Sequence, residues 1–318
     1  MPVSTQQQTS QFALDVAEGL SLGGQKKLAP RYFYDDLGSS LFEAITLLPE
    51  YGLTRADERL LRLHSGEIAR SVRHVSTVAE LGSGSGKKTS HIVRALQSTG
   101  PRVTYRPIDV SSLALSACER ELGSFCRVTP VCNDWLSGLE EISRERTGSG
   151  SMLLLFLGSS IGNLERLEIQ RFLGELRDRL RPDDYLLLGA DLVKHRETMI
   201  AAYDDPTGVT AAFNLNVLGR INRELGADFD LRSFGHEVRW NEGERRIEMH
   251  LVSFRNQTVT IGGLDARISF SAGETIWTES SHKFTENELD EFAQSSGFNP
   301  VASWNDPEWP FLEALWRV

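Results

Sequence analysis

Residues 78–96, VAELGSGSGKKTSHIVRAL, pass from an apolar run through three alternate glycines into a segment whose apolar residues recur with helical periodicity. A short apolar run, a glycine turn and an amphipathic helix in this order are typical of an open α/β sheet that binds a ligand at its edge. Glycine suits such a turn because it lacks a Cβ atom and readily adopts positive φ angles. The stretch therefore predicts both a fold class and the place of a ligand.

The spacing of the glycines distinguishes between possible ligands. A phosphate-binding loop needs a glycine five positions before Gly86, where Leu81 stands, and a dinucleotide-binding turn needs a glycine at position 87, which is a lysine. Residues 80–86, ELGSGSG, instead resemble the acidic-x-Gly-x-Gly-x-Gly motif of class I S-adenosylmethionine (SAM) methyltransferases. The alternative is a tight strand-to-helix turn that binds nothing.

The rest of the chain alternates in a way that extends this pattern. Apolar runs predict strands buried on both faces at 76–82, 102–110, 151–158 and 184–193. Amphipathic segments at 87–98 and 164–182 predict helices between them, so we expect an α/β fold with a mainly parallel sheet. After about residue 194 the apolar residues alternate with period two, as in antiparallel strands. A helix at 285–298 and two final strands are expected to return to the first sheet.

Composition and charge exclude several classes of partner. The 318 residues are 40% hydrophobic, no apolar stretch approaches the ~20 residues of a membrane span, and the opening residues MPVSTQQQTS lack the order of a secretory signal. We therefore expect a cytoplasmic protein without a membrane partner. The net charge of −10 argues against nucleic acid, so we expect a small-molecule substrate. We also expect a monomer. The three cysteines have no metal-ligand spacing, fit reduced thiols and predict no metal site.

Two acidic residues further along support the SAM interpretation. Asp109 ends the second predicted strand, where such folds place an acid that accepts hydrogen bonds from ribose hydroxyls. Asp134 follows the region of a third strand and can accept from the adenine amino group, with Trp135 beside the ring. Each acid taken alone is more often a turn or cap residue, but the three acidic positions occur in the expected order.

Longer segments resemble one family in particular. In chain order they are YFYDDLGSSLFEAITLLPEYGLTRAD, ELGSGSGKKT, FLGSSIGNL, DLVK, AYDDPTGVTAAFNLNVLGRINRELGADFDL, RIEM and TESSHKF. These resemble the histidine Nα-methyltransferases that make hercynine for ergothioneine synthesis. The departures are small: SGKKT stands where a TSEKT-like sequence is usual, and Tyr32 stands where a tryptophan is common.

The resemblance implies a class I, Rossmann-like methyltransferase core that binds SAM, and a second α+β domain that binds the substrate. The core would comprise residues 55–194 and 283–318, and the substrate domain residues 1–54 and 195–282. The resemblance also implies cofactor contacts at Tyr34, Gly82, Gly84, Lys88, Asp109, Asp134 and Trp135. Lys88 would pair with the cofactor carboxylate. From the sequence alone, Lys88 is equally well a solvated lysine at a helix start.

For the amino-acid part of the substrate, the resemblance implies contacts from Gly158, Asn163, Tyr203 and Phe213. Asn163 and Tyr203 would donate to the carboxylate, while the Gly158 carbonyl and Asn163 would orient the amine. From the residues alone, Asn163 would be a helix cap and the two aromatic residues would be core residues.

For the imidazole end, the resemblance implies contacts from Tyr51, Met249, Glu279 and Ser281. Glu279 would accept a ring N–H, Ser281 would serve the other nitrogen, and Met249 would form an apolar wall. An exposed strand carboxylate is the ordinary alternative for Glu279.

The expected reaction is Nα-trimethylation of L-histidine, with Tyr34 and Asn163 as the candidate catalytic residues that position the amine or relay its proton. Three alternatives remain open. The chain would methylate tryptophan, another amino acid or an imidazole derivative; it would be a nucleic-acid methyltransferase on the same core; or it would bind SAM without turnover.

Overall fold

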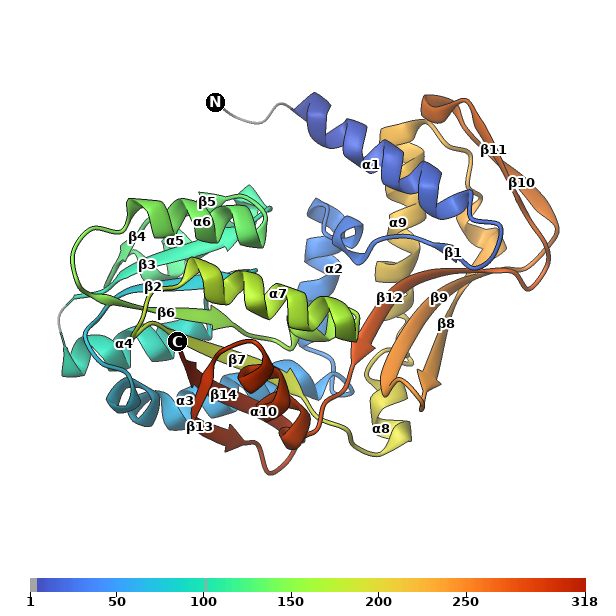
Figure 1. Cartoon of the computed structure of the whole chain (residues 1–318). Helices are drawn as coiled ribbons and strands as arrows, with labels where there is room; N and C mark the ends of the chain where they lie inside the picture. The colour runs from blue at the N-terminus through green and yellow to red at the C-terminus, as the bar shows by residue number, and fades with distance from the viewer. Residues whose placement is uncertain (1–4, 101) are drawn as a thin grey trace. The chain divides into compact units, whose positions relative to one another are not determined.

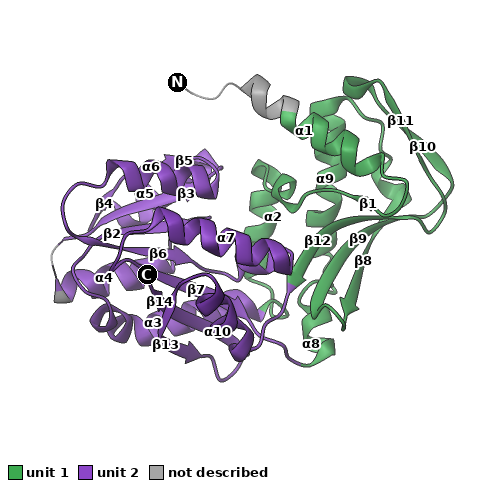
Figure 2. Cartoon of the chain, in the orientation of Figure 1, with its two compact units in different colours: residues 1–51, 195–281 green, residues 52–194, 282–318 purple. Residues whose placement is uncertain are grey.

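The computed structural model describes residues 5–100 and 102–318. They divide into two compact units: unit 1 takes the described part of Met1–Tyr51 together with His195–Ser281, and unit 2 takes Gly52–Lys194 together with His282–Val318 (Figure 2). The domain bounds expected from the sequence lie close to these limits. The functions assigned to the two domains stay predictions.

Unit 2 contains the α/β sheet (Figure 1). Its elements in chain order are α3 (Gly52–Ser71), β2 (Val75–Leu81), α4 (Thr89–Thr99), β3 (Thr104–Asp109), α5 (Ser112–Leu122), β4 (Arg127–Val128), β5 (Val131–Cys132), α6 (Trp135–Glu145), β6 (Ser151–Phe156), the 3₁₀ turn η2 (Ser160–Asn163), α7 (Arg166–Arg179), β7 (Tyr185–Asp191), α10 (Glu286–Ser295), β13 (Asn299–Asn305) and β14 (Phe311–Arg317). The predicted strands at 76–82, 102–110, 151–158 and 184–193 are confirmed as β2, β3, β6 and β7.

The strand order is β13-β14-β7-β6-β2-β3-β4, with β5 also paired to β3. The strands from β7 to β4 are parallel, and β14 inserts antiparallel beside β7. Every residue of β6 and β7 is buried, which explains why these strands read as continuous apolar runs. Helices α6, α7 and α10 share one apolar core with the sheet, and α3 packs against α4.

The strand order reverses between β2 and β6, because the chain first builds outward through β3 and β4 and then returns to β6 and β7. Open α/β sheets bind ligands in the crevice outside the carboxyl ends of the strands at such a point. The glycine turn follows β2 directly, and Gly158 follows β6. The topology therefore places these two segments at the edge where a ligand is expected.

Unit 1 combines the N-terminal segment with the period-two region. Its elements are α1 (Thr5–Leu20), β1 (Lys26–Lys27), η1 (Pro30–Phe33), α2 (Asp36–Thr46), α8 (Arg196–Ala201), α9 (Val209–Leu225), η3 (Leu231–Ser233), β8 (Phe234–Asn241), β9 (Arg246–Ser253), β10 (Gln257–Ile261), η4 (Gly262–Leu264), β11 (Ala266–Phe270) and β12 (Thr275–His282). One sheet has the order β1-β12-β9-β8, and β10 pairs with β11 as an antiparallel ribbon. Helix α2 packs on α9, which also contacts β8 and β9.

The end of β7 lies beside the residues that follow β12. Leu192 pairs with Phe284 in a parallel bridge, and two backbone hydrogen bonds flank it. Asp191, fully buried, accepts from Lys194 Nζ at 2.6 Å and lies 2.9 Å from Lys283 Nζ. Trp309 donates its indole N–H to the same carboxylate. One buried acid thus joins three separate segments of unit 2.

None of the helices in the described part of the chain combines the length and the apolar character that crossing a bilayer requires.

Candidate active site

The glycine turn adopts a conformation that other residues avoid. Gly82, Gly84 and Gly86 have φ angles of 65°, 52° and 68°. A Cβ atom on Gly86 would lie 2.9 Å from Cys118 Sγ, whereas one on Gly84 would meet no atom within 4 Å. The turn is therefore packed against α5 at Gly86 and open at Gly84, as close approach of a ligand requires.

The acid of the motif, Glu80, lies beneath the turn. It is fully buried and accepts hydrogen bonds from the hydroxyls of Thr89 and Tyr105. Burial raises the pKa of Glu80 to about 7, against these hydrogen bonds, which lower it. The motif acid thus ties β2 to the start of α4 and to β3.

Asp109 holds the turn from the neighbouring strand. One oxygen of Asp109 lies 3.2 Å from the Gly84 N–H nitrogen, and the other lies 2.9 Å from the Ser111 N–H nitrogen. Burial raises the pKa of the Asp109 carboxyl, although these backbone donors lower it. Asp109 is therefore positioned at the turn, as expected, and also stabilises it.

Asp134 and Trp135 lie at the start of α6. Asp134 is its N-cap, and one oxygen, Oδ1, accepts from the N–H groups of Leu136 and Ser137. Asp134 thus caps α6, as the residue alone suggested, and it does so with one oxygen of its carboxylate. A Cβ atom on Gly82 would lie 3.3 Å from Trp135 Nε1, so the indole lies beside the glycine turn.

Lys88 differs from the solvated lysine that the sequence alone allows. Its ammonium forms an ion pair with Asp57 of α3, whose side chain is fully buried. Burial opposes the charge on Lys88, but the attraction of Asp57 outweighs it and the pKa of the ammonium is raised. The same oxygen of Asp57 accepts from the Gly158 N–H at 2.9 Å. Asp57 is a site residue that the sequence reasoning missed, because only the packing of α3 brings it to the turn.

The loop after β6 carries Gly158 and Asn163. Gly158 and Ser159 have φ angles of 72° and 59°, and Ser159 Oγ accepts from the Asp191 N–H. Asn163 ends η2, and the N-cap of α7 is Glu165, which forms a reciprocal capping box with Glu168. The alternative that Asn163 caps the helix is therefore wrong.

Unit 1 brings most of the remaining predicted residues into one aromatic cluster. The Phe213 ring lies 5.7 Å from Tyr34 and 6.0 Å from Phe42, measured between centroids. Phe42 lies 6.3 Å from Tyr51, which lies 6.0 Å from Tyr203. The Tyr203 and Ser281 hydroxyls form a 2.7 Å hydrogen bond. Within unit 1, five residues expected from the resemblance are thus joined, through Phe42, into one continuous set of contacts: Tyr34, Tyr51, Tyr203, Phe213 and Ser281.

Phe42 of α2 completes this cluster and was not predicted. It links Tyr34 and Phe213 to Tyr51 through edge and tilted ring contacts. The only sequence signal was its place in the segment YDDLGSSLF. An aromatic residue in an amphipathic helix is usually a core residue, so this signal alone would not have identified it.

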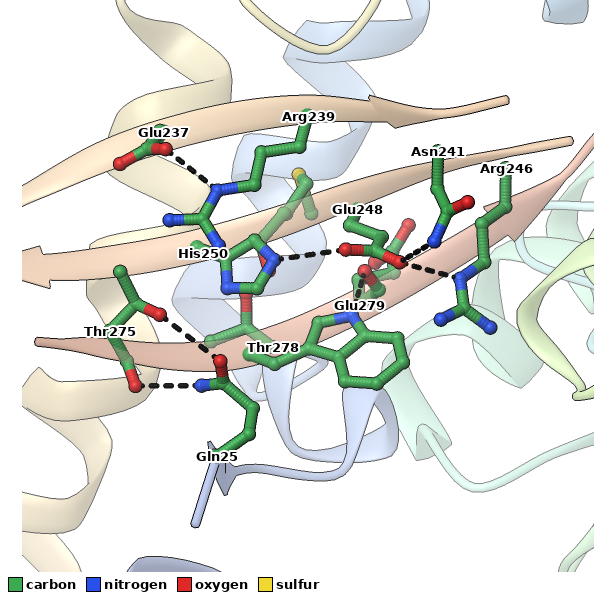
Figure 3. A network of polar contacts seen from close by, with 12 residues as sticks. Gln25, Glu237, Arg239, Asn241, Arg246, Glu248, His250, Thr275, Thr278 and Glu279 are labelled. Carbon is green, nitrogen blue, oxygen red and sulfur yellow. Dashed lines mark hydrogen bonds and ion pairs between the residues drawn. The ribbon is translucent and has the colours of Figure 1, made fainter. Parts of the chain in front are cut away.

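Met249 and Glu279 lie on neighbouring strands, β9 and β12. Thr278, which precedes Glu279, donates its hydroxyl to the Met249 carbonyl at 3.0 Å, in keeping with the pairing of these two strands. Figure 3 shows the polar contacts of a further acid of this sheet, Glu248 of β9. Glu248 accepts from Asn241 and Arg246 and lies 3.3 Å from His250 Nε2. Glu248 is thereby held by side chains of its own sheet.

Comparison with known proteins identifies the family of the chain. A family model described as "Histidine-specific methyltransferase, SAM-dependent" matches residues 12–318. The chain is 44% identical over 296 residues to the histidine N-alpha-methyltransferase of Mycobacterium tuberculosis, covering 92% of this chain and 90% of the relative. It is 42% identical over 301 residues to the protein of that name from Mycolicibacterium smegmatis, covering 93% and 92%.

A more distant relative is the Ergothioneine biosynthesis protein 1 of Neurospora crassa, which is 29% identical over 295 residues, covering 88% of this chain and 32% of the relative. The expected α/β methyltransferase fold and the SAM cofactor are confirmed. The chain belongs to the family of SAM-dependent, histidine-specific methyltransferases.

Proposed function

We propose that this chain transfers methyl groups from SAM to the α-amino group of L-histidine and that three transfers give hercynine. The observation that carries the proposal is the 44% identity over 92% of the chain to a histidine N-alpha-methyltransferase. The further step, use of the product in ergothioneine synthesis, is supported by the likeness to an Ergothioneine biosynthesis protein 1. The substrate is thus a single free amino acid.

The residues of unit 2 fit SAM. Gly84 leaves open space within 4 Å of where a side chain would begin, which suits close passage of a ligand. The Lys88 side chain keeps 24% of its surface exposed, and its ammonium is assigned to the carboxylate of the cofactor. Asp109 is assigned to the ribose hydroxyls, and Asp134 and Trp135 to the adenine. Bound SAM supplies the electrophilic methyl group.

The residues of unit 1 fit a small aromatic amino acid. The Tyr203–Ser281 hydrogen bond orients two hydroxyls within the aromatic cluster, and each hydroxyl can both donate and accept. Tyr203 is assigned to the substrate carboxylate and Ser281 to a ring nitrogen. Glu279 is assigned to the other ring N–H, with Tyr51 and Met249 as apolar walls.

Methyl transfer from SAM depends more on the position of the substrate amine than on covalent catalysis by the protein. In-line displacement needs the lone pair of a neutral amine aligned with the methyl group, so the ammonium must first lose its proton. Asn163 and the Gly158 carbonyl are assigned to orient the amine, and Tyr34 to hold it or relay its proton. The aromatic residues around Tyr34 and Phe213 reduce access of water.

A time course tests the number of transfers. Purified protein is incubated with SAM and L-histidine, and products are followed by mass spectrometry. Monomethyl and dimethyl histidine should appear transiently and the trimethyl product should accumulate. Accumulation of the monomethyl product alone, at long times and high SAM, would contradict trimethylation.

Substitution of Glu279 tests the origin of ring specificity. The Glu279→Ala variant should lose most of the preference for histidine over tryptophan in kcat/KM, because the ring N–H loses its acceptor. Glu248→Ala is the matched control on the neighbouring strand and should keep that preference. An unchanged preference in Glu279→Ala would show that this carboxylate does not read the ring.

A further inference from the structure

Asp57 connects two segments of the proposed site, the glycine turn and the loop after β6, which are assigned to different ligands. Its side chain is fully buried, and its Oδ2 atom accepts both from Lys88 Nζ and from the Gly158 N–H, the latter at 2.9 Å. Lys88 is assigned to the cofactor and Gly158 to the substrate amine. Lys88 keeps 24% of its side-chain surface exposed, so the pair joins a fully buried carboxylate to a partly exposed lysine side chain.

Asp57 also lies within hydrogen-bonding reach of a second buried acid, Glu313 of β14. As carboxylates, Asp57 Oδ1 and both Glu313 oxygens would lack a hydrogen-bond donor within the described structure. A proton on Glu313 supplies a donor for Asp57, because the Glu313 O–H then donates to the Asp57 carboxylate. Burial raises the pKa of Glu313 well above its usual range, and the charge of Asp57 and the hydrogen bond to it add to the shift.

The backbone around Glu313 is shaped to admit this pair. Gly189 of β7 lies opposite Glu313, and a Cβ atom there would stand 3.0 Å from Glu313 Oε1 and 3.3 Å from the Gly158 nitrogen. A larger residue at position 189 would therefore displace both groups. Asp57, Glu313 and the Gly158 N–H thus form one buried arrangement behind Lys88.

We propose that Asp57 is a positioning residue for methyl transfer, which fixes the Lys88 ammonium and the Gly158 loop in their binding geometry and is itself held by the proton of Glu313. A free lysine side chain loses much rotamer freedom when it binds a carboxylate. A lysine already held by Asp57 has lost that freedom before the ligand arrives, so binding is stronger. The inference rests on the proposed function, because Lys88 matters here only as a SAM contact.

Binding of S-adenosylhomocysteine, measured by calorimetry on the full chain, tests the proposal without the need for turnover. Asp57→Asn should weaken binding about tenfold, the loss expected for one well-oriented charge-assisted contact. Lys88→Met should weaken it by a similar factor. The double variant Asp57→Asn/Lys88→Met should bind no more weakly than Lys88→Met alone, because Asp57 acts through Lys88.

Asp184 provides a matched control in the same unit. It is also fully buried, pairs with Arg146 at 2.6 Å and accepts from the Met152 N–H at the opposite end of β6. Asp184→Asn should lower the unfolding temperature but leave the affinity for S-adenosylhomocysteine unchanged. This separates a role at the site from a general role in stability.

The outcomes separate the two proposals. Wild-type affinity in Asp57→Asn, or additive losses in the double variant, would overturn the positioning role and leave the proposed function intact. Failure of the wild-type chain to bind S-adenosylhomocysteine would overturn both.

If Asp57→Asn does not fold, two variants of Glu313 test the positioning role instead. Glu313→Gln keeps a donor for Asp57 and should bind as wild type, whereas Glu313→Leu removes it and should bind several-fold more weakly. Equal affinities for these two variants would overturn the proposal.

Discussion

Gly84 and Gly86 share a left-handed backbone but have different surroundings. The φ angles are 52° and 68°, and a side chain at either position would be strained by roughly 1–2 kcal/mol. At Gly86 a Cβ atom would also overlap Cys118 Sγ at 2.9 Å and Leu122 Cδ1 at 3.0 Å, whereas Gly84 has no atom within 4 Å. The two glycines therefore serve the site in different ways, Gly86 through packing and Gly84 through access.

Alanine substitution separates these roles. Gly84→Ala should cost about 1–2 kcal/mol of stability and weaken S-adenosylhomocysteine binding strongly, because the new methyl group enters the open space. Gly86→Ala should cost about 1–3 kcal/mol more in stability, from overpacking. Urea unfolding and calorimetric titration of both variants measure the two effects. Equal affinity for the ligand in Gly84→Ala and wild type would show that the open space is not the cofactor site.

Glu80 gives the stability of the apoprotein a characteristic dependence on pH. Its pKa rises from the ordinary 4.5 to about 7 because the group is buried. A raised pKa in the folded state means that the contribution of Glu80 to stability is fully present below about pH 4.5 and is lost as the pH rises through about 7. A shift of this size corresponds to about 3 kcal/mol between the two limits.

Glu80→Gln removes the titration and keeps an oxygen that accepts from Thr89 and Tyr105. Its free energy of unfolding, relative to that of wild type, should therefore rise as the pH increases from 5 to 8. Urea unfolding at several pH values measures this difference. A difference that stays constant over that range would contradict the raised pKa of Glu80.

At the residue scale, the sequence predicted the residues whose roles follow from local order along a strand and its turn. Asp109 was expected at the end of a strand and Asp134 after the third strand, and both are there. Both also hold backbone N–H groups of the fold. Asp57 and Glu313 were not expected, because one lies in a helix before β2 and the other in the last strand. Only the packing of this helix and this strand brings the two carboxyl groups to the turn. The periodicity of apolar residues along the sequence does not predict which elements pack together.

At the scale of the element, the strands and helices of unit 2 were largely predictable, since burial on both faces leaves continuous apolar runs. The third strand was harder: it is divided into β4 and β5, with Pro130 between them. Proline removes the N–H that a continuous ladder would need, so the strand breaks there. The residues alone also suggested Asn163 as the N-cap of α7. The N-cap is instead Glu165, which forms a reciprocal capping box with Glu168 at the start of the helix.

The contact between the end of β7 and the segment after β12 depends on Asp191. This acid faces two lysines, Lys194 and Lys283, whose side chains are 3% and 0% exposed. Burial lowers the pKa of Lys194 to about 8, against the attraction of Asp191. Asp191→Asn should destabilise the protein by about 3–5 kcal/mol, because both buried ammonium groups lose their counter-charge.

Asp183→Asn is a matched control for this prediction. Asp183 lies near the start of the same strand and pairs with Arg317, but both side chains are more than half exposed, so the loss should be small. Urea unfolding compares the two variants. A small loss in Asp191→Asn would show that this carboxylate is not needed to hold the two segments together.

At the scale of the whole molecule, the sequence indicated two parts. Continuous apolar runs are typical of the chain before about residue 194, and apolar residues alternate with period two after it. The structure divides into units with discontinuous segments at similar limits. Composition and charge could favour a small molecule but could not name it. Histidine was predicted as the substrate from long segments that resemble one family, and the family match over residues 12–318 supports this prediction.

The central claim is that this chain methylates the α-amine of histidine in preference to that of tryptophan. The most direct test is mass spectrometry of the purified protein incubated with SAM and an equimolar mixture of the twenty amino acids. The account predicts trimethylated histidine as the product and unmodified tryptophan. Methylated tryptophan or another methylated amino acid would contradict the assignment of Glu279 and Met249, and the absence of any product would contradict the proposed function.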